Sequence, residues 1–296
     1  MERRRFLGGC AAGVSALALR PLLPRFAGGP IPDMVVVHGK DYGGSVAAAV
    51  KALGGIGHFV KKGETVLVKP NAGWERTPEQ AANTHPDVVS AVVKLCVTAG
   101  ASRVIVADRT CHDAEDCFSR NGIGAAAKAA GAEVIYEDLK YVWRDFGGEL
   151  VKKYQLLDLF IEADKVINVP VAKHHGLSKL TCAMKNWMGV IGGKRALLHQ
   201  DIDTSVADLA AACTPSLTVV DATRVLVKNG PTGGKLEDVK QLDLVAAGYD
   251  QVTLDSWAAG LIGYKWQDVG YIVQAGKRGI GQPDPKKVKM KKIERA

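Results

Sequence analysis

The chain has 296 residues, of which 47% are hydrophobic and 24% are charged, and this is an ordinary globular composition. Its net charge of +8 does not indicate a nucleic-acid-binding face, because the excess lies in residues 1–29 and 277–296 and the body between them is close to neutral. After Pro30, no apolar stretch reaches the roughly 18 residues that a membrane-spanning helix needs, so no transmembrane segment is expected in the mature part.

The N-terminus predicts an export signal. Residues 3–7 read Arg-Arg-Arg-Phe-Leu, a pattern similar to the leader that the twin-arginine translocase recognises. A short, mildly apolar run and a patch of small residues follow, as in a cleaved signal peptide. We therefore expect residues 1–29 to be a signal peptide and the protein to be periplasmic or otherwise exported, with the translocase as a partner. Because this route carries folded proteins, it also favours a cofactor or a metal without identifying either.

Beyond the leader, short apolar runs alternate with stretches of helical periodicity. The first half predicts a strand at 34–37, a helix at 45–53, a strand at 65–68, a helix at 86–98, a strand at 103–107, a helix at 123–130 and a strand at 133–136. The second half predicts a strand at 165–169, a helix at 206–213, a strand at 216–220 and helices at 252–263 and 271–275. This alternation indicates an α/β fold with a mostly parallel sheet flanked by helices, built as one large domain or as two lobes with a cleft between them.

The C-terminal end differs in composition from the body. Residues 283–296 are rich in lysine and predict a basic tail, either solvated or in contact with phosphate or anionic lipid. The α/β domain is therefore expected to span residues 30–282, and the tail to be dispensable.

Three predicted strands end in polar residues that a hydrophobic core would not accommodate. Lys69 and Asn71 follow the second strand, Asp108 follows the third, and Asp221 follows the strand at 216–220. A single strand-end aspartate is often only a helix or turn cap. Since ligands of parallel sheets bind beyond the carboxyl ends of the strands, three polar strand ends predict one shared site.

The segment 169–195 carries the densest set of polar residues. His174 and His175 are adjacent, so at most one of them is expected to face a site. Lys185 and Asn186 lie in an otherwise apolar run, where a lysine needs a partner or a lowered pKa. That setting suits a general base, a nucleophilic amine or an anion clamp, or else a lysine that reaches solvent at a helix end. Gly189 permits a close backbone approach to a ligand.

Several familiar motifs are missing from the sequence. It contains no phosphate-binding loop, dinucleotide fingerprint or nucleophile elbow. Its six cysteines form no CxxC pair, so no iron–sulfur cluster is indicated, although Cys111 and Cys117 flank a polar loop and could pair after export. A metal assembled from distant aspartate and histidine ligands stays open, and so does the identity of any cofactor.

A set of short motifs, taken in order, resembles the bacterial and archaeal family known as domain of unknown function 362. The motifs are Val68-Lys69-Pro70-Asn71, Asn83-Thr84-His85-Pro86, Asn168-Val169-Pro170 with Lys173-His174, Met184-Lys185-Asn186 with Gly189, Gly230-Pro231-Thr232-Gly233-Gly234, and Asp250 with Leu254-Asp255. The resemblance covers about residues 34 to 282 and implies the fold class and the position of the site, but no reaction. Many members carry a cysteine-rich, ferredoxin-like segment that this chain lacks. A shorter stretch, Lys173-His174 with residues 192–195, is similar to lactate-racemase-like proteins, which bind a nickel pincer cofactor through a lysine.

These observations predict an enzyme that acts on a small anionic molecule, a carboxylate or a phosphate. The expected catalytic residues are Lys185, His174 and Asp108. The expected ligand-binding residues are Lys69, Asn71, Lys173, Asn186, Gly189, Asp221 and Gly230, the last in a glycine-rich loop that could also be an ordinary turn. Two alternatives are a periplasmic carrier of a metal or cofactor without turnover and an assembly partner of an exported redox complex.

Overall fold

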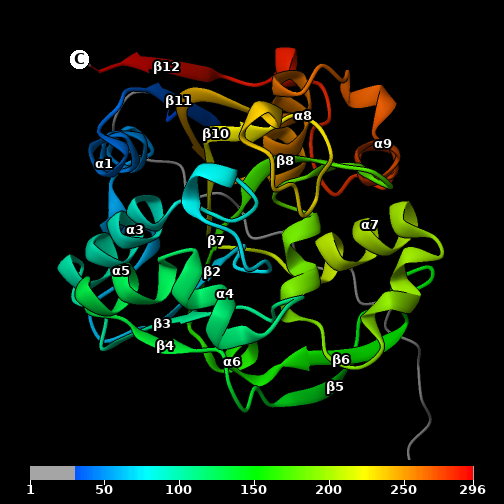
Figure 1. The fold of residues 1–296 in the computed structure, drawn as a ribbon, viewed down its shortest axis with the longest axis horizontal. Helices are drawn as coiled ribbons and strands as arrows, with labels where there is room; N and C mark the ends of the chain where they lie inside the picture. The colour runs from blue at the N-terminus through cyan, green and yellow to red at the C-terminus, as the bar shows by residue number, and fades with distance from the viewer. Residues whose placement is uncertain (1–30, 296) are drawn as a thin grey trace, which may run out of the picture. The chain divides into compact units, whose positions relative to one another are not determined.

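A long mixed sheet runs through the chain, whose residues 31–295 are described by a computed structural model (Figure 1). The expected signal peptide lies outside these described residues. The main path of the sheet has the strand order β12-β1-β11-β10-β7-β2-β3-β4, and β8 joins it beside β10, with β9 paired to β8. The bounds of these strands are β1 (Met34–His38), β2 (Thr65–Pro70), β3 (Arg103–Ala107), β4 (Glu133–Ile135), β7 (Lys165–Val169), β8 (Val171–His175), β9 (Lys179–Thr181), β10 (Leu217–Leu226), β11 (Val239–Gly248) and β12 (Met290–Glu294).

The pairing is parallel along most of this sheet. Strands β4, β3, β2, β7 and β10 are parallel to one another, and β11 is antiparallel to both of its neighbours, β10 and β1. The prediction of an α/β fold with a mostly parallel, helix-flanked sheet is therefore confirmed. The alternative of two lobes is not confirmed, because the residues from Ile31 onward form one compact unit.

Helices cover both faces of the sheet (Figure 1). One face packs against α1 (Tyr42–Ala52), α3 (Pro86–Thr98) and α5 (Ile123–Ala129), and the other against α7 (Ile202–Ala212), α8 (Gln251–Leu261) and α9 (Gly270–Lys277). Successive strand residues supply the two cores in turn: Val35 faces the first and Val36 the second. This period of two is why the strands read as continuous apolar runs.

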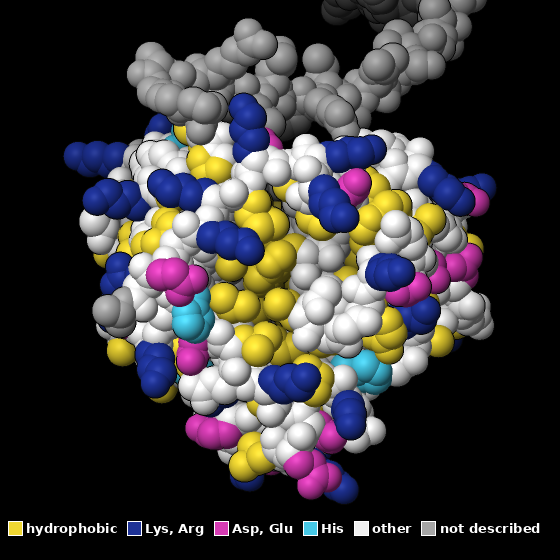
Figure 2. Space-filling view, turned by 90° about the horizontal axis from the view of Figure 1, so that it is seen from above, with side chains coloured by type: hydrophobic (Ala, Val, Ile, Leu, Met, Phe, Trp, Pro, Cys, Tyr) yellow, Lys and Arg dark blue, Asp and Glu magenta, His cyan; other side chains and the backbone are white. Residues whose placement is uncertain are grey.

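Smaller elements complete the described part. They are the helices α2 (Ile56–Phe59), α4 (Ala114–Arg120) and α6 (Asp158–Glu162), and an antiparallel hairpin of β5 (Tyr141–Asp145) and β6 (Lys153–Leu157), which forms a sheet of its own. Within residues 31–295, no helix is long and apolar enough to cross a bilayer. On the face seen in Figure 2, lysine and arginine side chains are spread out and do not gather into one basic patch.

The C-terminal segment is part of the sheet, which corrects the expected tail at 283–296. Strand β12 pairs in parallel with β1, from Met34 opposite Met290 to His38 opposite Glu294. Its lysines Lys291 and Lys292 stay exposed, so the strand forms through backbone hydrogen bonds while the charges remain in water. The domain boundary expected at residue 282 is therefore too early.

Candidate functional site

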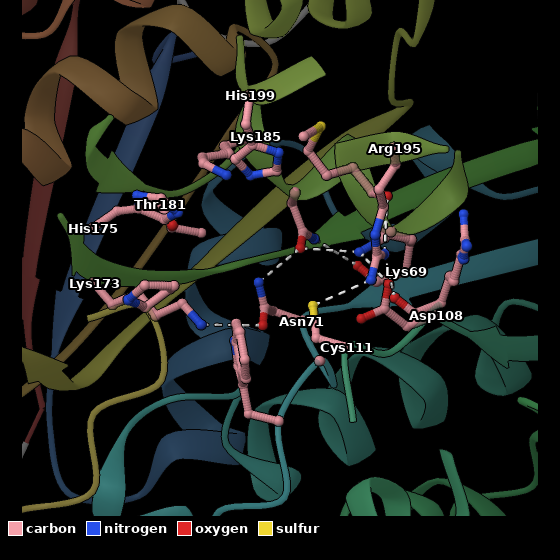
Figure 3. Close-up of a pocket in the computed structure, with 17 residues that line it drawn as sticks. Lys69, Asn71, Asp108, Cys111, Lys173, His175, Thr181, Lys185, Arg195 and His199 are labelled. Atoms are coloured by element: carbon pink, nitrogen blue, oxygen red, sulfur yellow. Dashed lines mark hydrogen bonds and ion pairs between the residues drawn. The ribbon is translucent and has the colours of Figure 1, made fainter. Parts of the chain in front are cut away.

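A cavity of about 260 Å³ opens beyond the carboxyl ends of β2 and β3, next to β8 and β9 (Figure 3). Among the residues that line it are seven that the sequence predicts for a site: Lys69, Asn71, Asp108, Lys173, Lys185, Asn186 and Gly189. In the view of Figure 3, Lys173, Thr181, His175 and Lys185 lie on one side, and Lys69, Asp108 and Arg195 on the other, with Asn71 between them. The cavity therefore lies where strand-end residues converge, beyond the carboxyl ends of parallel strands, which is the usual position of ligand sites in such sheets.

Lys69 and Asp108 form a buried ion pair at the end of β2 and β3. Lys69 Nζ lies 2.6 Å from Asp108 Oδ1, and the two side chains are only 1% and 3% exposed. The other carboxylate oxygen accepts a 2.7 Å hydrogen bond from the backbone N–H of Ala72. Burial lowers the pKa of Lys69 and raises that of Asp108, and their contact opposes both shifts. The one acidic side chain among the described lining residues, that of Asp108, is therefore already paired.

Gly189 is required by the packing of this pair. A Cβ on Gly189 would lie 1.8 Å from Asp108 Oδ1 and 2.5 Å from Lys69 Nζ. Its carbonyl also accepts a 2.8 Å hydrogen bond from the backbone N–H of Arg109. The glycine thus makes room for protein side chains, whereas the sequence suggested that it makes room for a ligand.

A chain of amides links the ion pair to the second lysine. Lys69 Nζ donates to Asn186 Oδ1 at 3.0 Å, and Asn71 Nδ2 donates to the same oxygen at 3.2 Å. The remaining oxygen of Asn71 accepts from Lys173 Nζ at 3.4 Å. Lys173 Nζ also donates to the carbonyl of Ala82 and lies 5.8 Å from the centre of the Trp74 ring. These contacts hold two lysines and two amides in one fixed arrangement along the cavity.

Lys185 and Thr181 differ from these residues because their polar ends have no partner in the part of the chain that the structure describes. Lys185 is 7% exposed, and its Nζ has no hydrogen-bond or ion-pair partner within residues 31–295. Thr181 is 5% exposed, and its hydroxyl also lacks a hydrogen-bond partner there. Burial lowers the pKa of Lys185 to about 8 and that of Lys173 to about 7. Buried polar groups without partners are rare in folded proteins, and here two of them line one cavity.

A buried carboxylate holds the backbone of the segment that carries Lys185. It is the 3₁₀ helix η2 (Lys185–Val190), and Asp255 of α8 accepts hydrogen bonds from the backbone N–H groups of Ala183 and Met184 just before it, at 2.5 and 3.1 Å. Burial raises the pKa of Asp255 to about 7. Asp255 therefore fixes the backbone from which Lys185 enters the cavity.

The two adjacent histidines on β8 point in different directions, as predicted, and it is His175 that lines the cavity. Its Nδ1 accepts from the backbone N–H groups of Leu177 and Ser178, at 3.1 and 3.3 Å. Burial, with nearby cations, lowers its pKa to about 3, so the ring is neutral and its hydrogen is on Nε2. His174 does not line the cavity: its Nδ1 accepts from the backbone N–H of Gly230 at 3.2 Å.

Asp221 and Gly230 also lie outside the cavity lining. Asp221 is inside β10, not beyond its end, and its carboxylate accepts from the backbone N–H of His85 at 2.6 Å and from both donors of Thr223. Gly230 packs against the carbonyl oxygen of His174, where a Cβ would be only 1.9 Å away. Both residues therefore shape the backbone around the cavity, and it is the next residue, Pro231, that lines it.

The protein is a relative of several known chains. Residues 66–260 match the family described as Domain of unknown function (DUF362). The chain belongs to this family. It is 28% identical over 220 residues to a thylakoid-associated protein of Synechocystis sp., a match that covers 71% of this chain and 67% of that one.

Two solved structures are similar at low identity. One is a protein from Thermotoga maritima, with 12% identity, a TM-score of 0.44, and 76% of this chain and 60% of that chain covered. The other is the lactate racemase apoprotein from Thermoanaerobacterium thermosaccharolyticum, with 11% identity, a TM-score of 0.43, and 77% and 56% covered. The DUF362 chain thus spans less than two thirds of the length of either structure.

Sequence reasoning missed several residues that line this DUF362 cavity. They are Gly73, Trp74, Arg109, Cys111, Thr181, Met188, Arg195, His199 and Pro231, together with His175, which the sequence considered beside His174 but did not choose. Arg195 is held by the carbonyls of Arg109 and Thr110, at 2.8 and 2.6 Å, and by Cys111 Sγ at 3.2 Å. Arg109 directly follows a strand-end aspartate, which is a usable signal, whereas nothing in the sequence around Thr181 marks its hydroxyl.

The cavity has few of the groups that bind metals or form disulfides. Among the described residues, no cluster of three or more His, Cys, Asp or Glu side chains is arranged to hold a metal ion. Cys111 is exposed and Cys117 is buried, and both are free thiols. The lining instead combines three lysines and two arginines with one aspartate, so its chemistry is that of a cationic pocket.

Proposed function

We propose that this DUF362 protein is an enzyme that binds and transforms a small carboxylate or phosphate in this cavity. One observation carries the proposal: Lys185 and Thr181, whose polar ends have no hydrogen-bond partner among the described residues, line a cavity in which the one acidic residue of that described lining, Asp108, is already paired with Lys69. An uncompensated buried cation is costly, and an anionic ligand would supply the missing counter-charge. The cavity volume suits a molecule of a few heavy atoms.

Distinct roles follow for the lining residues. Lys173 and Lys185 hold the anion, and Thr181 and the Nε2–H of His175 donate hydrogen bonds to it. The Lys69–Asp108 pair positions Asn186 and Asn71 and is close enough to the cavity for Asp108 to exchange protons with a ligand. In this assignment His175 takes the place that the sequence gave to His174.

Isothermal titration calorimetry with inorganic phosphate, acetate and succinate tests the binding step. We expect the Lys185→Met variant to lose at least about tenfold in affinity, since a charge-assisted hydrogen bond contributes roughly 1.5–3 kcal/mol. Lys194→Met, which removes an exposed lysine outside the cavity lining, is the matched control and should bind like the wild type. Equal affinities for wild type and Lys185→Met, or binding of none of the three anions, would contradict the proposal. A bound molecule that is never altered during long incubation with the protein would indicate a carrier instead of an enzyme.

We further propose that the protein is exported in the folded state by the twin-arginine translocase. The support is the run Arg3-Arg4-Arg5-Phe6-Leu7 and the signal-peptide layout that follows it. A folded passenger fits a protein whose cavity depends on segments that are far apart in sequence.

A further inference from the structure

The three lysines of the cavity have different surroundings, although all are buried (Figure 3). Lys69 is paired with a carboxylate at 2.6 Å, and Lys173 donates to two oxygens, those of Ala82 and Asn71. Lys185 alone of the three has no acceptor within the described residues. Among residues 31–295, its nitrogen therefore has no hydrogen-bond acceptor or ion-pair partner that would hold it in the ammonium form.

The nearby charges act in opposite directions. Arg195 lowers the pKa of Lys185, because a like charge disfavours a second ammonium, whereas Cys111 raises it. Burial is the larger cause, and the pKa of Lys185 falls to about 8. Desolvation and a neighbouring cation are the two conditions that turn a lysine into a nucleophile.

We propose that Lys185 forms an imine with the carbonyl carbon of a small 2-oxo acid bound in this cavity. This inference rests on the proposed function, because the carboxylate of the same molecule is the anion that the cavity binds. It names the substrate class, which is an anion with an adjacent carbonyl group. A buried lysine can act as a general base, a nucleophilic amine or an anion clamp, and the inference assigns the second of these roles to Lys185.

The chemistry needs no oxidant or reductant. The lone pair of Nζ attacks the carbonyl carbon, a C–N bond forms, and the C=O pair moves onto oxygen, which takes a proton as the nitrogen loses one. The resulting hydroxyl then leaves as water when it receives a second proton, and the nitrogen loses its other proton as the C=N bond forms. In total, the two amine hydrogens and the carbonyl oxygen leave as one water molecule.

Residues around Lys185 fit the needs of these steps. The Thr181 hydroxyl is buried and unpartnered, and it can accept a proton and donate one, so it can carry protons between nitrogen and oxygen. The neutral His175 ring offers its Nε2–H to the oxygen that develops negative charge. Lys173, held by Ala82 and Asn71, is placed to bind the carboxylate.

Reductive trapping tests the inference. Full-length protein is incubated at pH 7 with glyoxylate, pyruvate or 2-oxoglutarate and sodium cyanoborohydride, which reduces an imine to a stable secondary amine. Intact and peptide mass spectrometry then locate the N-carboxyalkyl group. We expect one group per chain on Lys185, formed at least about tenfold faster than on exposed Lys194, because a lower pKa enlarges the free-amine fraction at pH 7.

The matched variant is Lys185→Arg, which keeps the positive charge and cannot form an imine. It should show no trapping in the cavity, whereas Lys194→Met, the control outside the cavity lining, should be trapped on Lys185 like the wild type. Anion binding by the wild type is measured by calorimetry on the same preparation. Trapping on Lys173 instead of Lys185, or no trapping above the level of surface lysines with any of the three acids, overturns the inference. If anions still bind in that second case, only the imine is wrong, whereas the absence of any anion binding contradicts the proposed function itself.

Discussion

Lys69 and Lys185 show how differently one cavity can treat a buried amine. The first has a carboxylate at 2.6 Å, a neighbouring amide and a carbonyl, so its hydrogen-bonding capacity is used within the fold. The second has none of these contacts. A protein that kept Lys185 only for stability would gain by replacing it with an apolar side chain, which is a testable statement about function.

We predict that Lys185→Met stabilises the fold near neutral pH. The pKa of Lys185 is about 8 in the folded chain against an ordinary 10.5, so between these values the unfolded chain binds more protons and the stability of the wild type rises with pH. Below pH 8, the buried ammonium of Lys185 therefore lowers the free energy of unfolding of the wild type by on the order of 3 kcal/mol. The Lys185→Met variant does not carry this cost. Urea unfolding at pH 7 and pH 10 should show a large advantage for the variant at pH 7 and less than half of it at pH 10.

The exposed Lys194→Met variant should show no such advantage at either pH. If Lys185→Met were less stable than the wild type at both pH values, the amine would have a stabilising partner and the view of Lys185 as an uncompensated charge would be wrong.

At the scale of elements, β12 makes the C-terminal segment a part of the sheet. Besides its pairing with β1, the backbone N–H of Lys289 donates to Asp33 Oδ2 at 2.7 Å, and Arg295 lies 3.3 Å from Asp41 Oδ2. Met290 and Ile293 are partly buried against the two cores. This lysine-rich segment can form a strand because it lies at the edge of the sheet, and edge strands tolerate exposed charge on the side that faces water.

We predict that deletion of residues 284–296 destabilises the protein by on the order of 2 to 4 kcal/mol, from the lost strand hydrogen bonds and the apolar side chains uncovered on β1. Denaturant unfolding of the truncated and full-length proteins measures this difference. The double variant Lys291→Ser, Lys292→Ser separates charge from pairing and should leave stability nearly unchanged. A truncated protein as stable as the full chain would restore the original view of a dispensable tail.

The element that carries Lys185 could be located only roughly from the sequence. The apolar run from Leu180 to Val190 predicts a buried segment, and burial of all its residues agrees with that. It is nevertheless a strand end followed by η2, and not one regular helix, because Asp255 binds the backbone N–H groups at the bend. A partner that is 71 residues away cannot be recognised from local periodicity.

At the scale of the whole molecule, the site exists only when the chain is folded. Its lining residues come from β2, β8, β9, η2, the following 3₁₀ helix (Arg195–His199) and the loops that follow β2, β3 and β10. Helix α8 supports the site from outside the lining. A site assembled from such distant segments is destroyed by unfolding, and this is consistent with the proposed export of the folded chain.

The export proposal predicts that residues 1–33 carry a folded fluorescent reporter to the periplasm of a bacterial host, as seen by cell fractionation. Replacing both Arg3 and Arg4 by lysine should leave the reporter in the cytoplasm, whereas Arg20→Lys, outside the motif, should not. Export that persists without a working twin-arginine translocase would contradict the proposal.

The sequence by itself determined the alternation of strands and helices, since local hydrophobic periodicity reports which residues face a core, and it marked Lys69, Asn71, Asp108 and Lys185 because polar side chains are conspicuous beside apolar runs. Only the tertiary structure decided which polar residues meet. It paired Lys69 with Asp108, directed the side chain of His175 toward the cavity in place of His174, and placed Asp221 outside the cavity lining. The reason is physical. Hydrophobic periodicity is a local property of a chain. Ion pairing, the presence or absence of a hydrogen-bond partner for a buried polar group, and the shape of a cavity depend on contacts between segments that are far apart in the sequence.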